Sequence, residues 1–597
     1  MYPHRSYLKK FLVAAGICAV LASCTKSGFL ENKTTALNET LVFKDSLLTI
    51  QFLNGVYNQI GFTFNKGRWD THGNTEHSTD DGEYSLSATY RPDVILYNGT
   101  VSPTNYGTTS PTLADAWNIP YTNIRRCNLL MKNLPVAPLS ASIKSRMRGE
   151  ARCLRAWYYL QLLICYGGVP NVQDNVYGID DIINMPRQPF AELVTYLSTE
   201  LDEAMALLPA PGAYDAIDYG RVTKGTCMGL KSRLLLYAAS PLFNGGANTN
   251  NATAAQIAAA SYPTFSAARW QAAADAAQAV ISAGYFSLLV DDTKPGLGFY
   301  RTFNTRINPE FIFAVYRPVN KDFENYYLPT GLGSNYTRPT HNLAVAFPMK
   351  NGKAITDPAS GYDSTRPYTN RDPRFNYTII YNGARYASNT LTQIPIYNYN
   401  GGSSTTTYLF ASTPTGYWSR KMCDSTITAS AGSSVDHEWP LMRYAEILLN
   451  YAEAINETGQ PALAYPKLVE LRRRAGIDAG GDGLYGMKAN MTQAEMRTFI
   501  QNERRIELAF EDHRWNDIRR WKIAMTLYNG GPTGYNSIVT ITRVGTTGDL
   551  AAGTGLTFRY AVGTTTSLHT FRPEMYLLPI QDVEIRKMPA MVQNPGW

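Results

Sequence analysis

Three groups of residues have side chains of the kind that metal and catalytic sites use, so their spacing decides what chemistry they can support. His72, Glu76 and His77 follow the pattern His-x-x-x-Glu-His, which differs from both spacings that place zinc ligands and a general base on one helix face. Glycine, asparagine and threonine surround them, so a loop is predicted there and no zinc site. Asp80 and Asp81 could supply oxygen ligands to a structural calcium ion, and the sequence leaves that question open.

The third group is a run of carboxylates that contains Glu503, Glu507 and Glu511. Two such groups could serve as the acid and the nucleophile of a glycoside hydrolase. The same stretch is crowded with arginine, at Arg504, Arg505, Arg514, Arg519 and Arg520. Because guanidinium groups lower carboxylate pKa values and oppose a general acid, a structural salt-bridge network is predicted. The chain also lacks a Gly-x-Ser-x-Gly motif, a phosphate loop and a dinucleotide fingerprint, so no enzyme activity is predicted.

Recognition of a sugar needs less than catalysis: an aromatic ring to cover the C–H face and a few fixed polar groups for the hydroxyls. The chain contains 40 tyrosines against 22 phenylalanines, and tyrosine tolerates water at its hydroxyl. The predicted ligand-binding residues are Arg68, Trp69, Tyr90, Arg91, Asp93 and Tyr327. Tyrosine also fills protein cores, so each of these residues alone is weak evidence.

Helices must position these groups. From Met147 to Cys165, apolar or aromatic residues recur at intervals of three and four, which is typical of one helix face, and Gly167 follows as a stop signal. Ser266 is a predicted N-cap, and Thr492 opens a predicted capping box. Further helices are predicted at about 47–60, 224–239, 266–284, 441–457, 462–473 and 492–510.

Paired helices with short breaks predict a mostly α fold, a tetratricopeptide-like scaffold of helical hairpins. Two long segments, at about 61–112 and 295–440, have little helical period and are rich in tyrosine, asparagine and threonine. They are predicted to be large insertions of irregular loops and short strands. Because loops carry function more often than the elements they connect, these insertions are expected to build the ligand face.

The beginning of the chain predicts export and lipid attachment. A basic start precedes the apolar run Phe11 to Leu21, which is too short to span a bilayer and suits an export signal. Leu21-Ala-Ser-Cys24 resembles a bacterial lipobox, so residues 1–23 are predicted to be removed and Cys24 to be acylated. Several acyl chains would hold the protein on a membrane, since each buried methylene contributes about 0.8 kcal/mol. The alternative is an ordinary secretory signal with an incidental cysteine.

Charge and cysteine content exclude two classes of protein. The formal charge is +7, and it falls to +4 without residues 1–23, which hold three basic residues and no acid. No basic run that could follow a phosphate backbone is present, so nucleic acid is not a predicted partner. Beyond Cys24 the cysteines are an odd and scattered set, which argues against a disulfide framework: Cys127, Cys153, Cys165, Cys227 and Cys423.

Several motifs follow one another in a specific order through nearly the whole chain beyond Cys24. They are Phe29-Leu30-Glu31, Arg148-Gly-Glu-Ala-Arg152, Tyr166-Gly-Gly-Val-Pro170, Gly220-Arg-Val-Thr-Lys-Gly225, Arg371-Asp-Pro-Arg374, Arg443-Tyr-Ala-Glu446, Glu503-Arg-Arg-Ile-Glu507, Arg519-Arg520-Trp521 and Gln593-Asn-Pro-Gly-Trp597. In this order they resemble the SusD/RagB family of outer-membrane nutrient-binding lipoproteins.

The resemblance implies a tetratricopeptide-helix scaffold with a shallow glycan site and no catalysis. It also implies a seat on a SusC-like TonB-dependent transporter in the outer membrane, with the protein facing the cell exterior. In one respect the chain departs from the family. Members often place a tryptophan-bearing ligand loop after the segment that resembles Thr79-Asp-Asp81, and Tyr90-Arg-Pro-Asp93 stands there instead. Tyr90 could replace that tryptophan, or Trp69 could supply it. The alternatives are a surface scaffold for a protein or peptide nutrient and, less favoured, a glycoside hydrolase.

Overall fold

The computed structural model describes residues 38–62, 75–84, 91–106, 113–178, 180–400, 408–410, 413–432, 434–529 and 534–597. The predicted signal segment and Cys24, together with Arg68, Trp69 and Tyr90, lie outside these residues. Within them, no helix is both long enough and apolar enough to cross a membrane.

Nine long or central helices form the scaffold. They are α3 (Ser46–Tyr57), α5 (Asp115–Asn133), α6 (Ala141–Tyr166), α7 (Phe190–Leu207), α8 (Lys224–Ala239), α10 (Ala268–Ala283), α15 (Tyr444–Glu457), α16 (Tyr465–Arg474) and α17 (Gln493–Glu507). Each packs against its neighbour along the chain: α5 on α6, α6 on α7, α7 on α8, α8 on α10, α10 on α15, and α15 on both α16 and α17. The mostly α prediction with helical hairpins is confirmed.

Local signals place the ends of these helices. Thr223 and Thr492 form capping boxes at the starts of α8 and α17, which satisfies backbone N–H groups that have no partner within the helix. Gly167 ends α6 with a φ of 79°, and a Cβ at that residue would lie 2.6 Å from the carbonyl oxygen of Ala259. The α6 helix can therefore turn directly onto the segment around α9 (Ala254–Ala260) because residue 167 is glycine.

Three predicted boundaries were wrong. The N-cap of α10 is Ala267 rather than Ser266, and it makes no side-chain cap. Residues 441–443 belong to strand β8 (Trp439–Arg443), which pairs with β2 (Phe311–Val315), so pairing with a distant strand delays the start of α15. The α17 helix ends at Glu507 rather than near Phe510, because Phe510 has a left-handed backbone with a φ of 59°. The sequence reasoning also missed α5 and α7.

The insertions carry short helices and paired strands. The helices are α4 (Pro92–Tyr97), α11 (Leu297–Arg301), α12 (Asp322–Tyr327), α13 (His341–Ala346) and α14 (Pro373–Thr378). The strands are β1 (Gly82–Tyr84), β3 (Thr337–Pro339), β4 (Ile379–Ile380), β5 (Ala384–Ala387), β6 (Gln393–Ile396) and β7 (Trp418–Ser419). In the described residues β1 pairs with β3, β4 with β7 and β5 with β6, all antiparallel.

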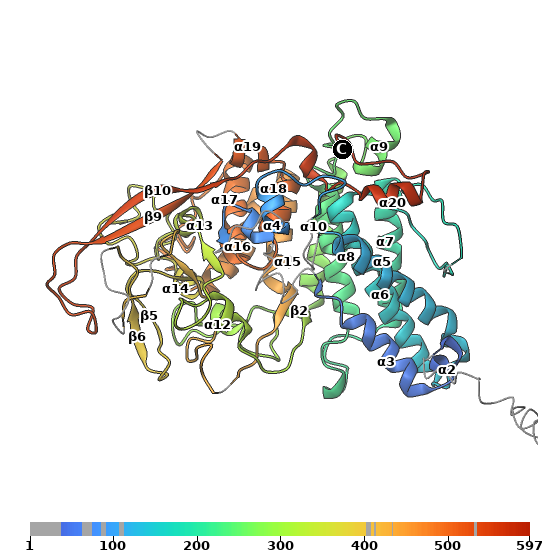
Figure 1. Ribbon diagram of the computed structural model, residues 1–597, viewed down its shortest axis with the longest axis horizontal. Helices are drawn as coiled ribbons and strands as arrows, with labels where there is room; N and C mark the ends of the chain where they lie inside the picture. Colours follow the sequence, from blue (N-terminus) through green and yellow to red (C-terminus); the bar gives the residue numbers. More distant parts are fainter. Residues whose placement is uncertain are drawn as a thin grey trace, which may run out of the picture.

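A long hairpin, β9 (Tyr535–Arg543) and β10 (Phe558–Leu568), follows the last scaffold helices and was not predicted. Figure 1 shows the scaffold helices α3 to α8 gathered on one side of the molecule and the insertions on the other, with the hairpin running along the upper edge of the insertion side. The remaining short helices are α2 (Glu39–Phe43), α18 (Arg514–Arg520), α19 (Ala524–Asn529) and α20 (Asp582–Lys587). The five cysteines beyond Cys24 are free, and four of them are fully buried.

Candidate functional site

A cleft of about 260 Å³ lies where the first insertion, the second insertion and the C-terminal hairpin meet. The two-stranded ladder of β1 and β3 forms its floor, with Glu83 opposite Arg338 and Tyr84 opposite Thr337. Helix α4 supplies Asp93 and Tyr97, and β10 supplies the run Thr564 to Ser567. Because β1, α4, β3, residues 414–415 and the β9–β10 hairpin converge here, this cleft is the part of the insertions that best fits a ligand site.

Tyrosine rings form one wall of the cleft, and neighbouring groups fix them. The ring of Tyr84 stacks on Tyr336, with centroids 5.7 Å apart and planes 15° apart. The guanidinium of Arg91 covers the other part of the Tyr84 ring at 3.4 Å from its centroid. Tyr97 stacks on His569 at 4.8 Å. The rings are therefore held in place before any ligand arrives, which lowers the entropy cost of binding.

Arg338 is the least satisfied charged group in the cleft. Its guanidinium makes no ion pair within the described residues, and its Nε atom is buried without a hydrogen-bond partner there. Burial lowers the pKa of Arg338 to about 10, so the side chain is still charged at neutral pH. A half-buried cation with unused donors is available to bind the hydroxyl groups of a ligand.

The remaining polar groups of the cleft are already organised. Glu83 accepts hydrogen bonds from Asn536 at 2.8 Å and lies 3.0 Å from Nε2 of His569. The pairing of β9 and β10 is interrupted between Thr564 and Leu568, and the hydroxyl-bearing residues at this irregularity are those that line the cleft. Irregularities of this kind change the direction in which side chains point. The cleft thus combines fixed rings, hydroxyls and a guanidinium that has no ion-pair partner in the described part of the chain.

The structure brings together only part of the predicted ligand set. Arg91 and Asp93 form a buried ion pair, with Nη2 of Arg91 2.6 Å from Oδ2 of Asp93. Burial raises the pKa of Asp93 to about 6 despite that arginine. Asp93 lines the cleft, while Arg91 supports the Tyr84 ring from behind. Both residues are therefore placed to shape the site rather than to present an exposed surface.

Tyr327 has no exposed surface. Its ring packs against Phe323 at 5.6 Å and against Phe510 at 6.5 Å, so the structure uses it as a core residue. We therefore do not propose that Tyr327 contacts the ligand. The reason is tertiary: folding brings Tyr327 of α12 against Phe510, 183 residues later in the chain, which the tyrosine-rich composition of the segment does not reveal.

Sequence reasoning missed two parts of the cleft. Arg338 was overlooked, although it follows Tyr336 by two residues and no acid lies close to it in sequence. The run Thr564-Thr-Thr-Ser567 was also overlooked. A run of four hydroxyl residues in a strand could have indicated a polar surface, but β1, α4 and Arg338, which line the cleft with it, lie more than 200 residues away.

The carboxylates of α17 form a buried network, as predicted. Glu507 contacts Arg374, Arg443 and Arg474, and these guanidinium groups hold its pKa well below the usual range. Glu511 contacts Arg443 and Lys421. Each is sealed from solvent, so neither can protonate a glycosidic oxygen. The predicted arginine partners were wrong: Arg504 pairs with Asp517, Arg505 and Arg514 pair with Asp80, and Arg520 pairs with Glu453.

The residues considered as metal ligands are held by arginine. Asp80 is 2.8 Å from both Arg505 and Arg514, and Asp81 is 2.6 Å from Arg505. Guanidinium groups at these distances compete with a bound cation, so the calcium site considered at Asp80 and Asp81 is not supported. The described residues contain no cluster of three or more His, Cys, Asp or Glu side chains that could hold a metal.

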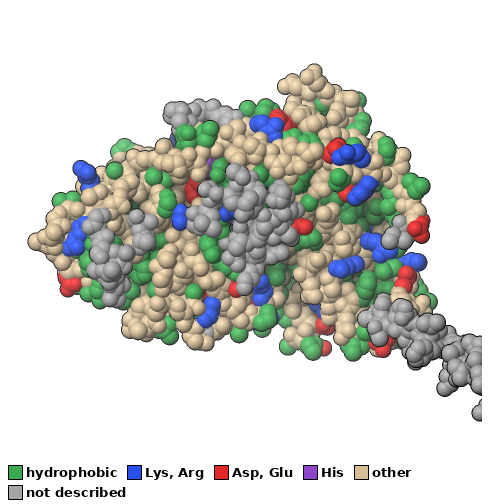
Figure 2. All heavy atoms as spheres, viewed as in Figure 1, with side chains coloured by type: hydrophobic (Ala, Val, Ile, Leu, Met, Phe, Trp, Pro, Cys, Tyr) green, Lys and Arg blue, Asp and Glu red, His purple; other side chains and the backbone are tan. Residues whose placement is uncertain are grey.

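Figure 2 shows Lys and Arg side chains dispersed over the visible face, interspersed with acidic ones at the scaffold end. On this face they form no continuous stripe of the kind that follows a phosphate backbone.

Known proteins identify the family of the chain. A family profile described as "SusD family" matches residues 303–597. A second profile, described as "Starch-binding associating with outer membrane", matches residues 29–236. The chain belongs to the SusD family. The resemblance seen in the ordered motifs is thereby confirmed, and the second description associates the family with the outer membrane.

The known relatives of this SusD-family protein are similar to it over different shares of their length. SusD-like protein P2 of Formosa agariphila is 42% identical over 96 residues, which cover 16% of this chain and 18% of that protein. The structure of a SusD-like protein from Bacteroides fragilis is 25% identical, covers 93% of this chain and 98% of that one, and has a TM-score of 0.71. A laminarin-binding SusD-like protein is 19% identical, covers 93% and 100%, and has a TM-score of 0.53. The chain thus spans about a fifth of P2 and nearly all of both solved structures.

Proposed function

We propose that this SusD-family protein is a non-catalytic surface lipoprotein that captures an oligosaccharide in the cleft and delivers it to a SusC-like TonB-dependent transporter. The observation that carries the proposal is that the half-buried ring of Tyr97 lines the same cleft as the Arg338 guanidinium, which makes no ion pair within the described residues. Rings cover the C–H faces of sugar units, and a guanidinium donates to their hydroxyls. No titrating carboxylate pair is needed for this task.

The size of the cleft limits the strength of binding. A cavity of about 260 Å³ is at the small end of ligand sites and holds about one sugar unit. The rest of a longer chain would lie over the surface. Binding of micromolar to millimolar strength is therefore expected, about −8 to −4 kcal/mol. Weak binding suits a protein that must release its ligand to a transporter.

Attachment to the membrane is proposed from the lipobox at Cys24. Acyl chains on that cysteine would anchor the chain in the outer membrane, facing the exterior, where a β-barrel transporter can receive the ligand. Affinity purification of the chain from its native outer membrane should yield a TonB-dependent transporter in the same fraction. Recovery of the chain alone, under conditions that preserve other membrane complexes, would count against this partner.

The ligand proposal is tested by calorimetry on the purified full chain with laminarihexaose and maltoheptaose. These probes represent the glycan classes named for the laminarin-binding neighbour and for the family profile. Replacing Tyr97, which is half-buried at the cleft, by alanine removes one stacking surface and should weaken binding about fivefold to tenfold. Tyr285 is a matched control, because its ring is partly exposed beside Phe286 and does not line the cleft.

Saturable binding that is weakened by Tyr97→Ala and unchanged by Tyr285→Ala supports glycan capture at the cleft. If both variants bind the glycan as tightly as the wild type, the glycan site lies outside the cleft. If neither probe binds, nor any member of a wider oligosaccharide panel, while the chain still co-purifies with a transporter, a peptide nutrient becomes the better reading. New reducing ends after prolonged incubation would instead indicate hydrolysis.

A further inference from the structure

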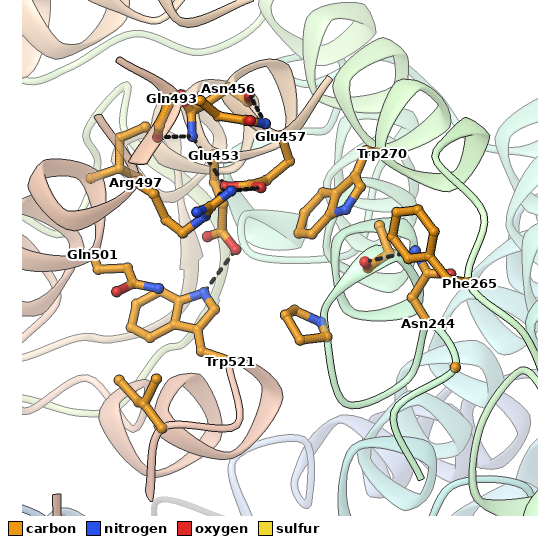
Figure 3. A pocket seen from close by; sticks show the side chains of 15 residues that line it. Asn244, Phe265, Trp270, Glu453, Asn456, Glu457, Gln493, Arg497, Gln501 and Trp521 are labelled. Carbon is orange, nitrogen blue, oxygen red and sulfur yellow. Dashed lines mark hydrogen bonds and ion pairs between the residues drawn. The ribbon is translucent and has the colours of Figure 1, made fainter. Parts of the chain in front are cut away.

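A second and larger cavity, of about 710 Å³, lies in the helical scaffold and is separate from the cleft. The end of α8, the start of α10, one face of α15 and one face of α17 enclose it, together with the segment after α18. None of its lining residues belongs to the predicted or observed cleft residues. Figure 3 shows Trp270 and Trp521 on opposite sides of the central space, with Phe265 at the edge.

The aromatic walls of this scaffold pocket are rigid. The indole Nε1 of Trp521 donates to Glu453 at 2.8 Å, and the guanidinium of Arg520 lies 4.7 Å from the ring centroid. Trp521 and Trp270 are 7% and 5% exposed, so each presents part of its ring surface to the cavity and is otherwise packed. Phe265 differs, since 66% of it is exposed at the rim of the cavity.

Polar groups in the scaffold pocket are left without partners in the described part of the chain. The side-chain amide of Gln501 and the Nη1 group of Arg497 line or face the cavity and make no hydrogen bond there. The side-chain oxygen of Asn456 is fully buried and unsatisfied, although its Nδ2 donates to Glu457 at 3.0 Å. Buried polar atoms without partners are uncommon in native proteins. Of the three, only the Asn456 oxygen is buried, whereas the side chains of Gln501 and Arg497 are partly exposed at the cavity and can reach a polar ligand.

The charges around the scaffold pocket are balanced. Glu457 accepts two hydrogen bonds from Arg497, at 2.6 and 2.5 Å. Glu453 is bound on both oxygens by Arg520, at 2.5 and 2.7 Å. A charged ligand would have to break one of these pairs and leave a buried charge behind. A neutral ligand that both donates and accepts hydrogen bonds fits without that cost.

We propose that the scaffold pocket binds a neutral saccharide unit, between Trp270 and Trp521, as a second glycan site of the protein. The choice of a saccharide rests on the proposed function, whereas the position of the site does not. Two aromatic surfaces would cover the C–H faces of the sugar ring. Gln501 and Arg497 would donate to its hydroxyls, and the side-chain oxygen of Gln501 would accept from one of them. The cavity has room for about two sugar units.

The experiment is saturation-transfer NMR of the full chain with laminaribiose and with maltose, repeated in the Arg338→Met background, in which the cleft should bind tenfold to a hundredfold more weakly. The pocket variants are Phe265→Ala and Gln501→Ala, which alter exposed or partly exposed side chains and should leave the fold intact. The matched controls are Tyr285→Ala and Gln271→Ala, on the outer surface near α10. N-acetyltryptophanamide serves as the probe for an aromatic side chain of a partner protein.

The expected result is that disaccharide signals persist in Arg338→Met and that the affinity behind them falls at least fivefold when Phe265→Ala or Gln501→Ala is added. The inference is overturned if Arg338→Met alone abolishes every disaccharide signal, or if the pocket variants bind as their controls do. It is also overturned if N-acetyltryptophanamide binds the pocket and the sugars do not. By contrast, loss of binding in the pocket variants together with unchanged binding in Arg338→Met would overturn the cleft and keep the scaffold pocket.

Discussion

Replacing Arg338 by methionine should strengthen the fold and weaken ligand binding at the same time. The reason is that the guanidinium has no ion-pair partner among the described residues, so its burial is a cost to the folded protein. A pKa of about 10, against an ordinary value of 12.5, corresponds to about 3 kcal/mol of unfavourable charge burial at pH 7. Methionine keeps most of the apolar stem and removes the charge. After local relaxation, a gain of about 1–2 kcal/mol in the free energy of unfolding is expected.

The same substitution removes a charged hydrogen-bond donor from the cleft. Such a donor contributes about 1.5–3 kcal/mol to a neutral partner, so the Kd for laminarihexaose or maltoheptaose should rise about tenfold to a hundredfold. The Kd of Arg338→Lys is expected to lie between those of the wild type and Arg338→Met, because lysine keeps the charge but lacks the planar guanidinium fork. Arg559→Met is the control, since Arg559 is exposed on β10 and does not line the cleft.

Urea unfolding and calorimetry measure the two effects independently. If Arg338→Met lowers the free energy of unfolding by more than about 1 kcal/mol, the arginine has a stabilising partner and the reasoning from unpaired burial is wrong. If stability rises but binding is unchanged, Arg338 is a cost without a function in the cleft, and the proposed glycan site loses its main polar anchor.

Three other perturbations test separate features. Arg443→Met removes one of the cations that hold Glu310, Glu507 and Glu511 in the core and should cost about 3–5 kcal/mol in urea unfolding, whereas Arg586→Met in an exposed pair should change little. Burial lowers the pKa of His341 to about 4, so the unfolded chain binds more protons below pH 6.5 and stability falls as the pH falls. The free energy of unfolding of the wild type, relative to that of His341→Asn, should fall by about 1–2 kcal/mol between pH 7.5 and pH 5. A difference between the two proteins that does not change with pH would contradict this. Cys24→Ala should abolish labelling by radioactive palmitate and release the chain from the membrane fraction, and retained labelling would disprove the lipobox.

The sequence alone determined the features that depend on neighbours along the chain. Helical periods, the capping box at Thr492 and the stop at Gly167 involve contacts three or four residues apart, so they are visible in one dimension. The order of short motifs likewise identified the family before any coordinates. Periodicity failed where a distant partner intervened, as at residues 441–443, which pair with β2 instead of starting a helix.

Only the tertiary structure decided which side chains form the site. Arginine density around residue 507 correctly predicted an ionic network, but the partners Arg443 and Arg374 lie 64 and 133 residues away and had to be brought there by folding. Burial is likewise a property of packing, so the sequence could not separate Tyr327 in the core from Tyr97 at the cleft. A tyrosine ring is equally suited to both environments, and the elements that fold over it determine which of the two it occupies.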